Sequence, residues 1–119
     1  MKTFRFLILA AVVGCLLLSV SLCLAQDSLN VTKVGQLYAN WNCAYSVTLS
    51  GSLAYVADGY AGLRLVNITN PFNPIEIGYY ITANCSYNVA LSGSYAYVAV
   101  GDAGLEVVNV SNPSAPTLV

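Results

Sequence analysis

The sequence predicts an all-β protein made of two four-stranded antiparallel blades of an incomplete β-propeller, preceded by a hydrophobic signal helix. Three observations lead to this prediction. The chain repeats itself at an interval of 42 residues, and each copy contains four short apolar runs separated by Gly or Pro. The first 25 residues have the composition of an export signal.

The N-terminal segment predicts export. Lys2 and Arg5 precede an almost wholly apolar run at residues 6–24. The chain becomes polar at Gln26, after the small residue Ala25, so we expect residues 1–25 to be a signal peptide cleaved after Ala25. Residues 26–33 then form a short lead-in, and the protein is expected to be secreted or displayed at the cell surface.

Two alternatives for this segment stay open. The apolar run of residues 6–24 approaches the roughly 20 residues that span a bilayer, so an uncleaved membrane anchor is the alternative localisation. Residues 12–15 look like a bacterial lipobox, but mostly apolar residues follow Cys15 where a lipoprotein would turn polar.

Charge excludes one class of partner. Without residues 1–25 the chain has a net charge of −3, and Lys33 and Arg64 are its only basic residues. Nucleic-acid binding by phosphate neutralisation therefore has no basis. Because an isolated sheet facing water needs alternating polar positions, this scarcity of charge also predicts that most strand faces are covered.

The repeat defines the organisation of the chain. Residues 42–74 align with residues 84–116 and are identical at 21 of 33 positions. We assign the first repeat to residues 34–76 and the second to residues 77–119, which ends at the start of a further strand. Upstream, Val34-Gly35 corresponds to Ile77-Gly78, with one extra residue in the first copy before its Cys.

Each repeat predicts four strands, because turn residues separate alternating or fully apolar runs. The expected strands are residues 45–49, 53–57, 63–68 and 75–81 in the first copy, and 87–91, 95–100, 105–110 and a strand from 117 in the second. Four strands in about 42 residues is the period of a propeller blade, and a solenoid is the main rival. Helical repeats are excluded because no run has a period of 3.6.

The repeated strings resemble a known family. These are Ser-Gly-Ser-x-Ala-Tyr-Val-Ala (50–57, 92–99), Ala-Gly-Leu-x-x-Val-Asn (61–67, 103–109) and Asn-Pro-x-x-Pro (70–74, 112–116), which resemble the LVIVD repeat. The resemblance implies an exported or surface β-propeller protein with no common catalytic activity. Where the family often carries Asp, this chain has Asn67 and Asn109, so no carboxylate acts there.

Two blades cannot close a ring, since propellers need about four to eight. We therefore expect the partners of this chain to be other blades of the same ring, supplied either by missing sequence or by self-association. Surface proteins or glycans are further candidate partners.

Cys43 and Cys85 occupy equivalent positions in the two repeats. An exported protein invites a disulfide, but residues related by a blade rotation point the same way, whereas a bridge needs facing side chains. We predict buried thiols and disfavour a bridge.

Four glycosylation patterns begin at Asn30, Asn67, Asn84 and Asn109. Because most of them recur at repeat-equivalent positions, we predict that they bond to the backbone of turns.

Asp58 and Asp102 lie beside Gly, as in calcium loops, but they do not align with each other. We predict solvated turn carboxylates and neither a metal site nor a cofactor.

The aromatic residues divide into two groups. Tyr45, Tyr55, Tyr87 and Tyr97 repeat and are predicted to pack between blades, although a carbohydrate platform is the alternative. Trp41, Tyr60 and Phe72 do not repeat and are the candidates for contact with a partner.

Taken together, these residues predict a non-enzymatic interaction or scaffold module. The chain has no His, no paired carboxylates in one motif and no phosphate loop, so it supplies no catalytic constellation. The alternative is a fragment of a propeller enzyme or of a carbohydrate-binding receptor whose active residues lie in missing blades.

Overall fold

The computed structural model describes residues 33–37 and 41–119. The predictions for the signal peptide, its cleavage site, the alternative anchor and Asn30 lie outside these residues. Within the described ranges, no helix has the length and apolar character needed to cross a membrane. The elements are β1 (Ser46–Ser50), β2 (Leu53–Ala57), β3 (Leu63–Asn67), β4 (Ile75–Tyr80), β5 (Ser86–Ser92), β6 (Tyr95–Val100), the short 3-10 helix η1 (Gly101–Ala103), β7 (Gly104–Asn109) and β8 (Thr117–Leu118).

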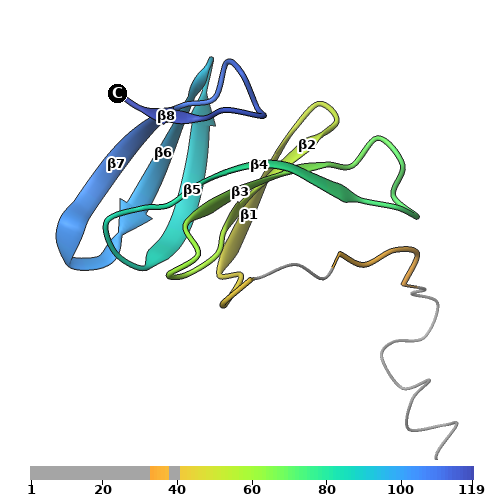
Figure 1. Cartoon of the computed structure of the whole chain (residues 1–119), viewed down its shortest axis with the longest axis horizontal. Helices are drawn as coiled ribbons and strands as arrows, with labels where there is room; N and C mark the ends of the chain where they lie inside the picture. Colours follow the sequence, from red (N-terminus) through yellow and green to blue (C-terminus); the bar gives the residue numbers. More distant parts are fainter. Residues whose placement is uncertain (1–32, 38–40) are drawn as a thin grey trace, which may run out of the picture. The chain divides into compact units, whose positions relative to one another are not determined.

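These strands form two antiparallel four-stranded sheets, each with its strands in sequence order (Figure 1). The all-β prediction is confirmed, and the strand ends lie within one residue of those predicted. The first sheet comprises β1–β4 and the second comprises β5–β8. The predicted repeat boundary between residues 76 and 77 falls inside β4, which pairs with β3 of the first sheet.

Glycine shapes the first hairpin of each sheet. Gly51 and Gly93 follow β1 and β5 and have φ values of +58° and +56°. A residue with a Cβ rarely adopts this left-handed conformation, so the two-residue turn requires Gly. The repeated Ser-Gly-Ser string is therefore the local cause of the two tight hairpins.

The two sheets pack face to face. Tyr55, Ala57, Leu63 and Leu65 form the packed face of the first sheet, and Val89, Ala96, Val98 and Val108 form that of the second, all in one buried cluster. Removing these apolar side chains from water supplies the main driving force for the contact.

Polar contacts join the first strands of the two sheets. Thr48 Oγ1 donates a hydrogen bond to the carbonyl oxygen of Val89 (2.6 Å), and Ser46 Oγ donates one to Asn88 Oδ1 (2.7 Å). Gly59 and Ser86 form an isolated antiparallel bridge. These bonds fix the register of one sheet against the other.

The remaining two faces differ. On the outer face of the first sheet, Ala54, Val56, Arg64 and Val66 are buried, whereas Val47 and Leu49 of β1 are exposed. The open face of the second sheet, formed by Tyr97, Ala99, Leu105 and Val107, is half-buried to exposed. The difference is largest at two equivalent leucines: Leu63 is 0% exposed in the first sheet, whereas Leu105 is 63% exposed in the second.

Residues 34–37 lie against the first sheet in the way that β4 lies against the second. A Cβ at Gly35 would overlap the carbonyl oxygen of Pro71, and a Cβ at Gly78 would overlap that of Pro113. Pro71 and Pro113 are equivalent residues of the two Asn-Pro-x-x-Pro turns. The structure therefore agrees with the sequence alignment of Val34-Gly35 with Ile77-Gly78, because Gly35 and Gly78 approach equivalent prolines.

Candidate functional site

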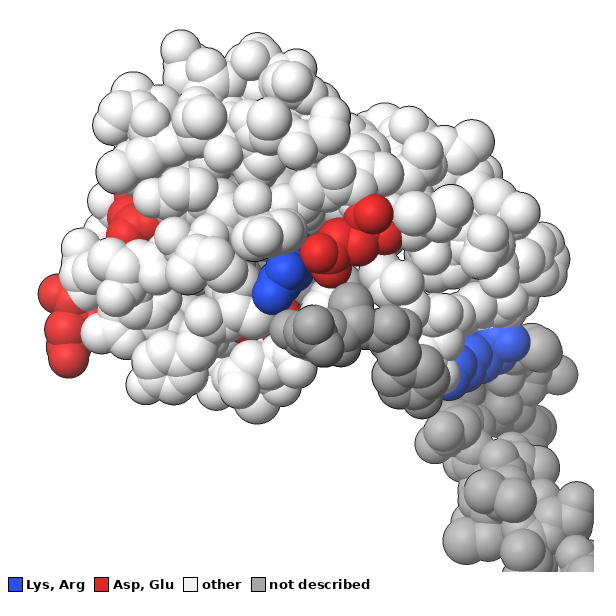
Figure 2. All heavy atoms as spheres, viewed as in Figure 1, with Lys and Arg blue, Asp and Glu red and all other residues white. Residues whose placement is uncertain are grey.

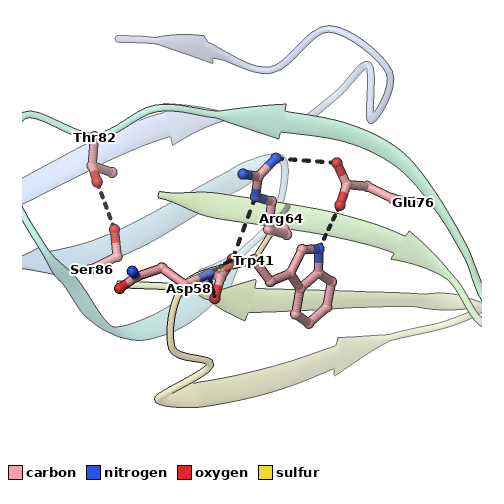
Figure 3. Close-up of polar contacts among 7 residues, drawn as sticks. Trp41, Asp58, Arg64, Glu76, Thr82 and Ser86 are labelled. Carbon is pink, nitrogen blue, oxygen red and sulfur yellow. Dashed lines mark hydrogen bonds and ion pairs between the residues drawn. The ribbon is translucent and has the colours of Figure 1, made fainter. Parts of the chain in front are cut away.

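A charged cluster lies on the outer face of the first sheet (Figure 3). The guanidinium of Arg64 on β3 stands between two carboxylates: its Nε is 3.7 Å from Asp58 Oδ2 and its Nη1 is 3.2 Å from Glu76 Oε1. The same guanidinium lies over the ring of Tyr79, 4.9 Å from the ring centroid. Cross-strand pairing of Arg64 with Tyr79 in β4 brings these groups together.

This cluster holds the segment that enters β1. The indole Nε1 of Trp41 donates a hydrogen bond to Glu76 Oε2 (2.7 Å), as Figure 3 shows. The backbone N–H of Asn42 lies 3.1 and 3.2 Å from the two carboxylate oxygens of Asp58. Both acids therefore fasten residues 41–42 to the sheet.

The prediction that Asp58 is a solvated turn carboxylate is wrong. Its side chain is 0% exposed, because Arg64 and the backbone of Asn42 replace water as its partners. Asp102, in contrast, is exposed, as predicted. The repeat-equivalents of Asp58, Arg64 and Glu76 are Val100, Glu106 and Leu118, so the cluster belongs to the first sheet alone.

Burial of Asp58 predicts a pH dependence of stability. Desolvation raises the pKa of Asp58 above its usual 3.8, partly opposed by the Asn42 N–H and the Arg64 charge. Since the folded protein then holds this proton more tightly than the unfolded chain, the contribution of Asp58 is fully present below about pH 4 and lost as pH rises through the folded-state pKa.

We therefore expect Asp58→Asn to flatten the decline in unfolding free energy as the pH rises above about 4, measured by urea titration at fixed protein concentration. The exposed Asp102→Asn variant should retain the decline of the parent chain. Identical pH profiles for Asp58→Asn and the parent would contradict this prediction.

Tyrosines gather where β1 and β5 begin. The rings of Tyr45 and Tyr87 lie 5.1 Å apart at a tilt of 50°, and both side chains are about half exposed. The charges of Cys43, Cys85 and Tyr60 all raise the pKa of Tyr45, with Cys43 contributing most. A side-chain hydrogen bond to Cys85 is the main cause that raises the pKa of Tyr87. Three aromatic rings and two thiols therefore lie close together at this end of the sheets.

The predicted packing role of the repeating tyrosines holds for only part of the set. Tyr55 is buried between the sheets, and this burial raises its pKa. Its equivalent Tyr97 lies on the open face and is only half-buried. Tyr45 and Tyr87 contact each other but remain exposed to solvent.

The predicted burial of the cysteines is correct for Cys85 and wrong for Cys43. Both are free thiols, and Cys43 is exposed. Cys85 is 3% exposed because it enters β5 against the first sheet.

Thiol reactivity should follow this difference. In a chain that starts at Gln26, a thiol reagent under native conditions should modify Cys43 rapidly and Cys85 at least about tenfold more slowly. Both should react in denaturant without reductant. If no thiol reacts until reductant is added, a disulfide joins the two residues.

The three partner-contact candidates do not come together. Trp41 is half-buried and bonded to Glu76, so it acts within the fold. Tyr60 and Phe72 are 69% and 70% exposed, but they lie in the turns at opposite ends of β3. Tyr60 belongs to the tyrosine group at the start of β1 and β5.

The asparagines of the glycosylation patterns bond to the backbone of turns, as predicted. Asn67 Oδ1 accepts a hydrogen bond from the N–H of Thr69, and Asn109 Oδ1 accepts one from that of Ser111, both at 2.9 Å. Asn84 Oδ1 accepts one from the N–H of Cys85 at 2.7 Å. Asn67 and Asn109 end β3 and β7 in the same way, whereas Asn84 lies just before β5.

The described surface has little chemistry beyond these groups. Figure 2 shows a face that is almost entirely uncharged, with one group of adjacent basic and acidic side chains near its centre. Among residues 33–37 and 41–119, no group of three or more Cys, Asp or Glu side chains is arranged to hold a metal ion. The open face of the second sheet carries a shallow hollow of about 190 Å³ lined by Asn88, Val89, Ala90, Tyr97, Ala99 and Leu105.

The fold defines a class of tandem-repeat all-β proteins in which each repeat forms one four-stranded sheet. The LVIVD repeat model matches residues 43–82 and 85–119, which together make up more than half of the chain. The chain therefore belongs to the LVIVD-repeat family. No curated protein and no solved structure matches it.

Proposed function

We propose that this chain is an exported, non-enzymatic interaction or scaffold module of the β-propeller type. Its two sheets pack on each other through broad apolar faces. We expect other proteins or blades to bind the remaining apolar face in the same way. The observation that supports this proposal most strongly is the open face of the second sheet, which presents Leu105 and Tyr97 to solvent where the first sheet buries Leu63 and Tyr55. Exposed apolar faces of this kind mark interaction surfaces.

The propeller arrangement is supported by the way the sheets stack. Each sheet is an antiparallel meander with strands in sequence order, and its inner strand contacts the inner strand of the neighbour through Thr48 and Ser46. The two central strands of the first sheet, β2 and β3, are buried on both faces, as expected for a blade with a neighbour on each side.

Export is tested by expressing the full chain with a C-terminal tag in a bacterial host. We expect the tagged product outside the cytoplasm, with Gln26 at its N-terminus. A matched chain lacking residues 2–25 should remain in the cytoplasm. Tagged full-length chain retained in the inner membrane would favour the anchor, and retention in the cytoplasm would overturn export. A hydrolase or lyase activity of the exported product would overturn the non-enzymatic role.

The tyrosine group favours one second candidate, a carbohydrate-binding receptor. Tyr45 and Tyr87 expose aromatic rings 5.1 Å apart, Tyr60 is exposed close enough to influence both, and such rings stack on the apolar faces of sugars. Affinity electrophoresis in gels that contain soluble polysaccharides tests this function. Retardation that is lost in Tyr45→Ala and kept in Phe72→Ala would support it.

A further inference from the structure

Each sheet places an asparagine side chain beside a tyrosine ring at the end where its first strand begins. In the first sheet, a Cβ at Gly59 would lie 2.8 Å from Asn42 Oδ1 and 3.4 Å from Tyr45 Cε2. The equivalent group of the second sheet consists of Gly101, Asn84 and Tyr87. A Cβ on that second glycine would lie 3.5 Å from the amide carbon and 3.6 Å from the ring. Each repeat therefore sets one amide next to one phenol.

Backbone hydrogen bonds hold the two groups together at the junction of the sheets. The N–H of Gly59 donates to the carbonyl oxygen of Ser86 (3.1 Å), and the N–H of Ser86 donates to that of Gly59 (2.8 Å). These bonds fix the turn that carries Tyr60 beside the strand that carries Tyr87. The ring of Tyr87 in turn lies 5.1 Å from that of Tyr45. The tyrosine group, Tyr45, Tyr60 and Tyr87, is thus built jointly by both sheets.

The two amides have hydrogen-bonding groups left for a ligand. Asn84 Oδ1 accepts the N–H of Cys85 (2.7 Å), which fixes the position of this amide. Its Nδ2 and the whole side-chain amide of Asn42 bond to no other residue in the part of the chain that the structure describes. Donors and an acceptor therefore stand beside aromatic rings that are about half exposed or more.

The charge near the group disfavours an acidic ligand. Asp102 follows the glycine of the second group and is exposed, whereas Asp58 is fully buried. Arg64 is the one basic residue in 34–119, and it is buried in the charged cluster on the outer face of the first sheet. A carboxylate or sulfate would therefore meet Asp102 without a cation to neutralise it. Aromatic rings with amides and no cation fit a ligand that has an apolar face and uncharged hydroxyl groups.

We propose that the tyrosine group and the two amides bind an uncharged sugar unit of an extracellular polysaccharide. The tyrosine rings stack on the apolar face of the sugar, and Asn42 and Asn84 exchange hydrogen bonds with its hydroxyl groups. Binding of this kind rests on the second proposed function, that of a carbohydrate-binding receptor. It adds that the ligand is neutral and that the two asparagines contact it. Because backbone bonds already fix the group, little ordering is needed when the sugar binds.

Affinity electrophoresis of the exported chain tests the ligand class with two sets of soluble polysaccharides. The neutral set is hydroxyethylcellulose, xyloglucan and galactomannan, and the acidic set is carboxymethylcellulose, pectate and alginate. We expect retardation by a neutral polysaccharide and none by the acidic set. Retardation by the acidic set overturns the neutral ligand but leaves the receptor function standing. No retardation in either set overturns the receptor function as well.

Asn42→Ala tests the amide contact without disturbing the fold. The variant keeps the backbone N–H that bonds to Asp58, and it loses only the side-chain amide. Its dissociation constant for the retarding polysaccharide should rise about three- to tenfold. Asn73→Ala removes an exposed amide from the turn at the other end of β3, so it is the matched control and should bind like the parent. Equal binding by Asn42→Ala and Asn73→Ala overturns the amide contact.

Tyr87 tests the stacking contact. Tyr87→Ala should weaken binding about tenfold or more, because it removes the ring on which the sugar stacks. Tyr87→Phe keeps the ring and should bind within about threefold of the parent. The circular dichroism spectra of both variants should match that of the parent, since this side chain is half exposed. Binding that Tyr87→Ala leaves unchanged, or that Tyr87→Phe weakens as much as Tyr87→Ala does, overturns stacking.

Discussion

Leu63→Ala should destabilise the protein by about 2–5 kcal/mol, one of the two largest effects that we expect. Leu63 is 0% exposed and lies in the cluster that joins the two sheets. Its truncation removes apolar contacts and leaves a cavity that neighbouring β-strands cannot close, because they are held in register on both sides. Urea titration of the parent and variant at equal protein concentration measures the difference.

Leu105→Ala is the matched control, because the same residue type occupies the equivalent position of the second repeat. Leu105 is 63% exposed, so its truncation should change the unfolding free energy by no more than about 0.5 kcal/mol in dilute solution. The comparison is made at a concentration at which copies are dissociated. Equal losses for the two variants would show that Leu105 is covered in solution.

Strand positions were predictable from the sequence because local chemistry determines them. Gly51 and Gly93 require left-handed turns, and Pro71 and Pro74 end the ladders. The repeat supports each prediction twice, since a strand expected in one copy is also expected at the equivalent residues of the other. This is why predicted and observed strand ends agree within one residue.

The fate of the charged residues was not predictable in the same way. Asp58 follows Ala57 and precedes Gly59, a setting typical of an exposed turn. Its burial depends on Arg64 and Glu76, which approach it only through the pairing of β2, β3 and β4. A signal was present, because charges stand in the first repeat where Val100 and Leu118 stand in the second.

The difference in solvent exposure between equivalent residues could not be predicted from the sequence either, for a different reason. Cys43 and Cys85, or Leu63 and Leu105, have the same local sequence but different neighbours. Whether a face is covered depends on which sheet lies next to it, and this is a property of the stack. The repeat predicts which faces match, whereas the structure shows which of them are occupied.

Arg64→Ala should cost about 3–5 kcal/mol, because it leaves the Asp58 carboxylate buried without its counter-charge. Arg64 is 8% exposed and also holds Glu76, which in turn accepts the hydrogen bond of Trp41. Loss of the guanidinium therefore loosens the segment at residues 41–42 as well as the sheet. The unfolding free energy near pH 7 and the fluorescence of Trp41 provide independent measurements.

The double variant Arg64→Leu with Asp58→Val separates loss of the ion pair from loss of packing. Val is the residue that the second repeat carries at the position of Asp58, where Val100 is fully buried. Replacing a buried pair by apolar residues of similar volume is often neutral or stabilising, so the double variant should recover at least half of the loss seen in Arg64→Leu. The double variant also removes the hydrogen bond from the Asn42 N–H to Asp58. If the double variant is no more stable than Arg64→Leu, the loss of this bond offsets the gain from removing the unpaired charge, and Asp58 therefore holds the entering segment in place.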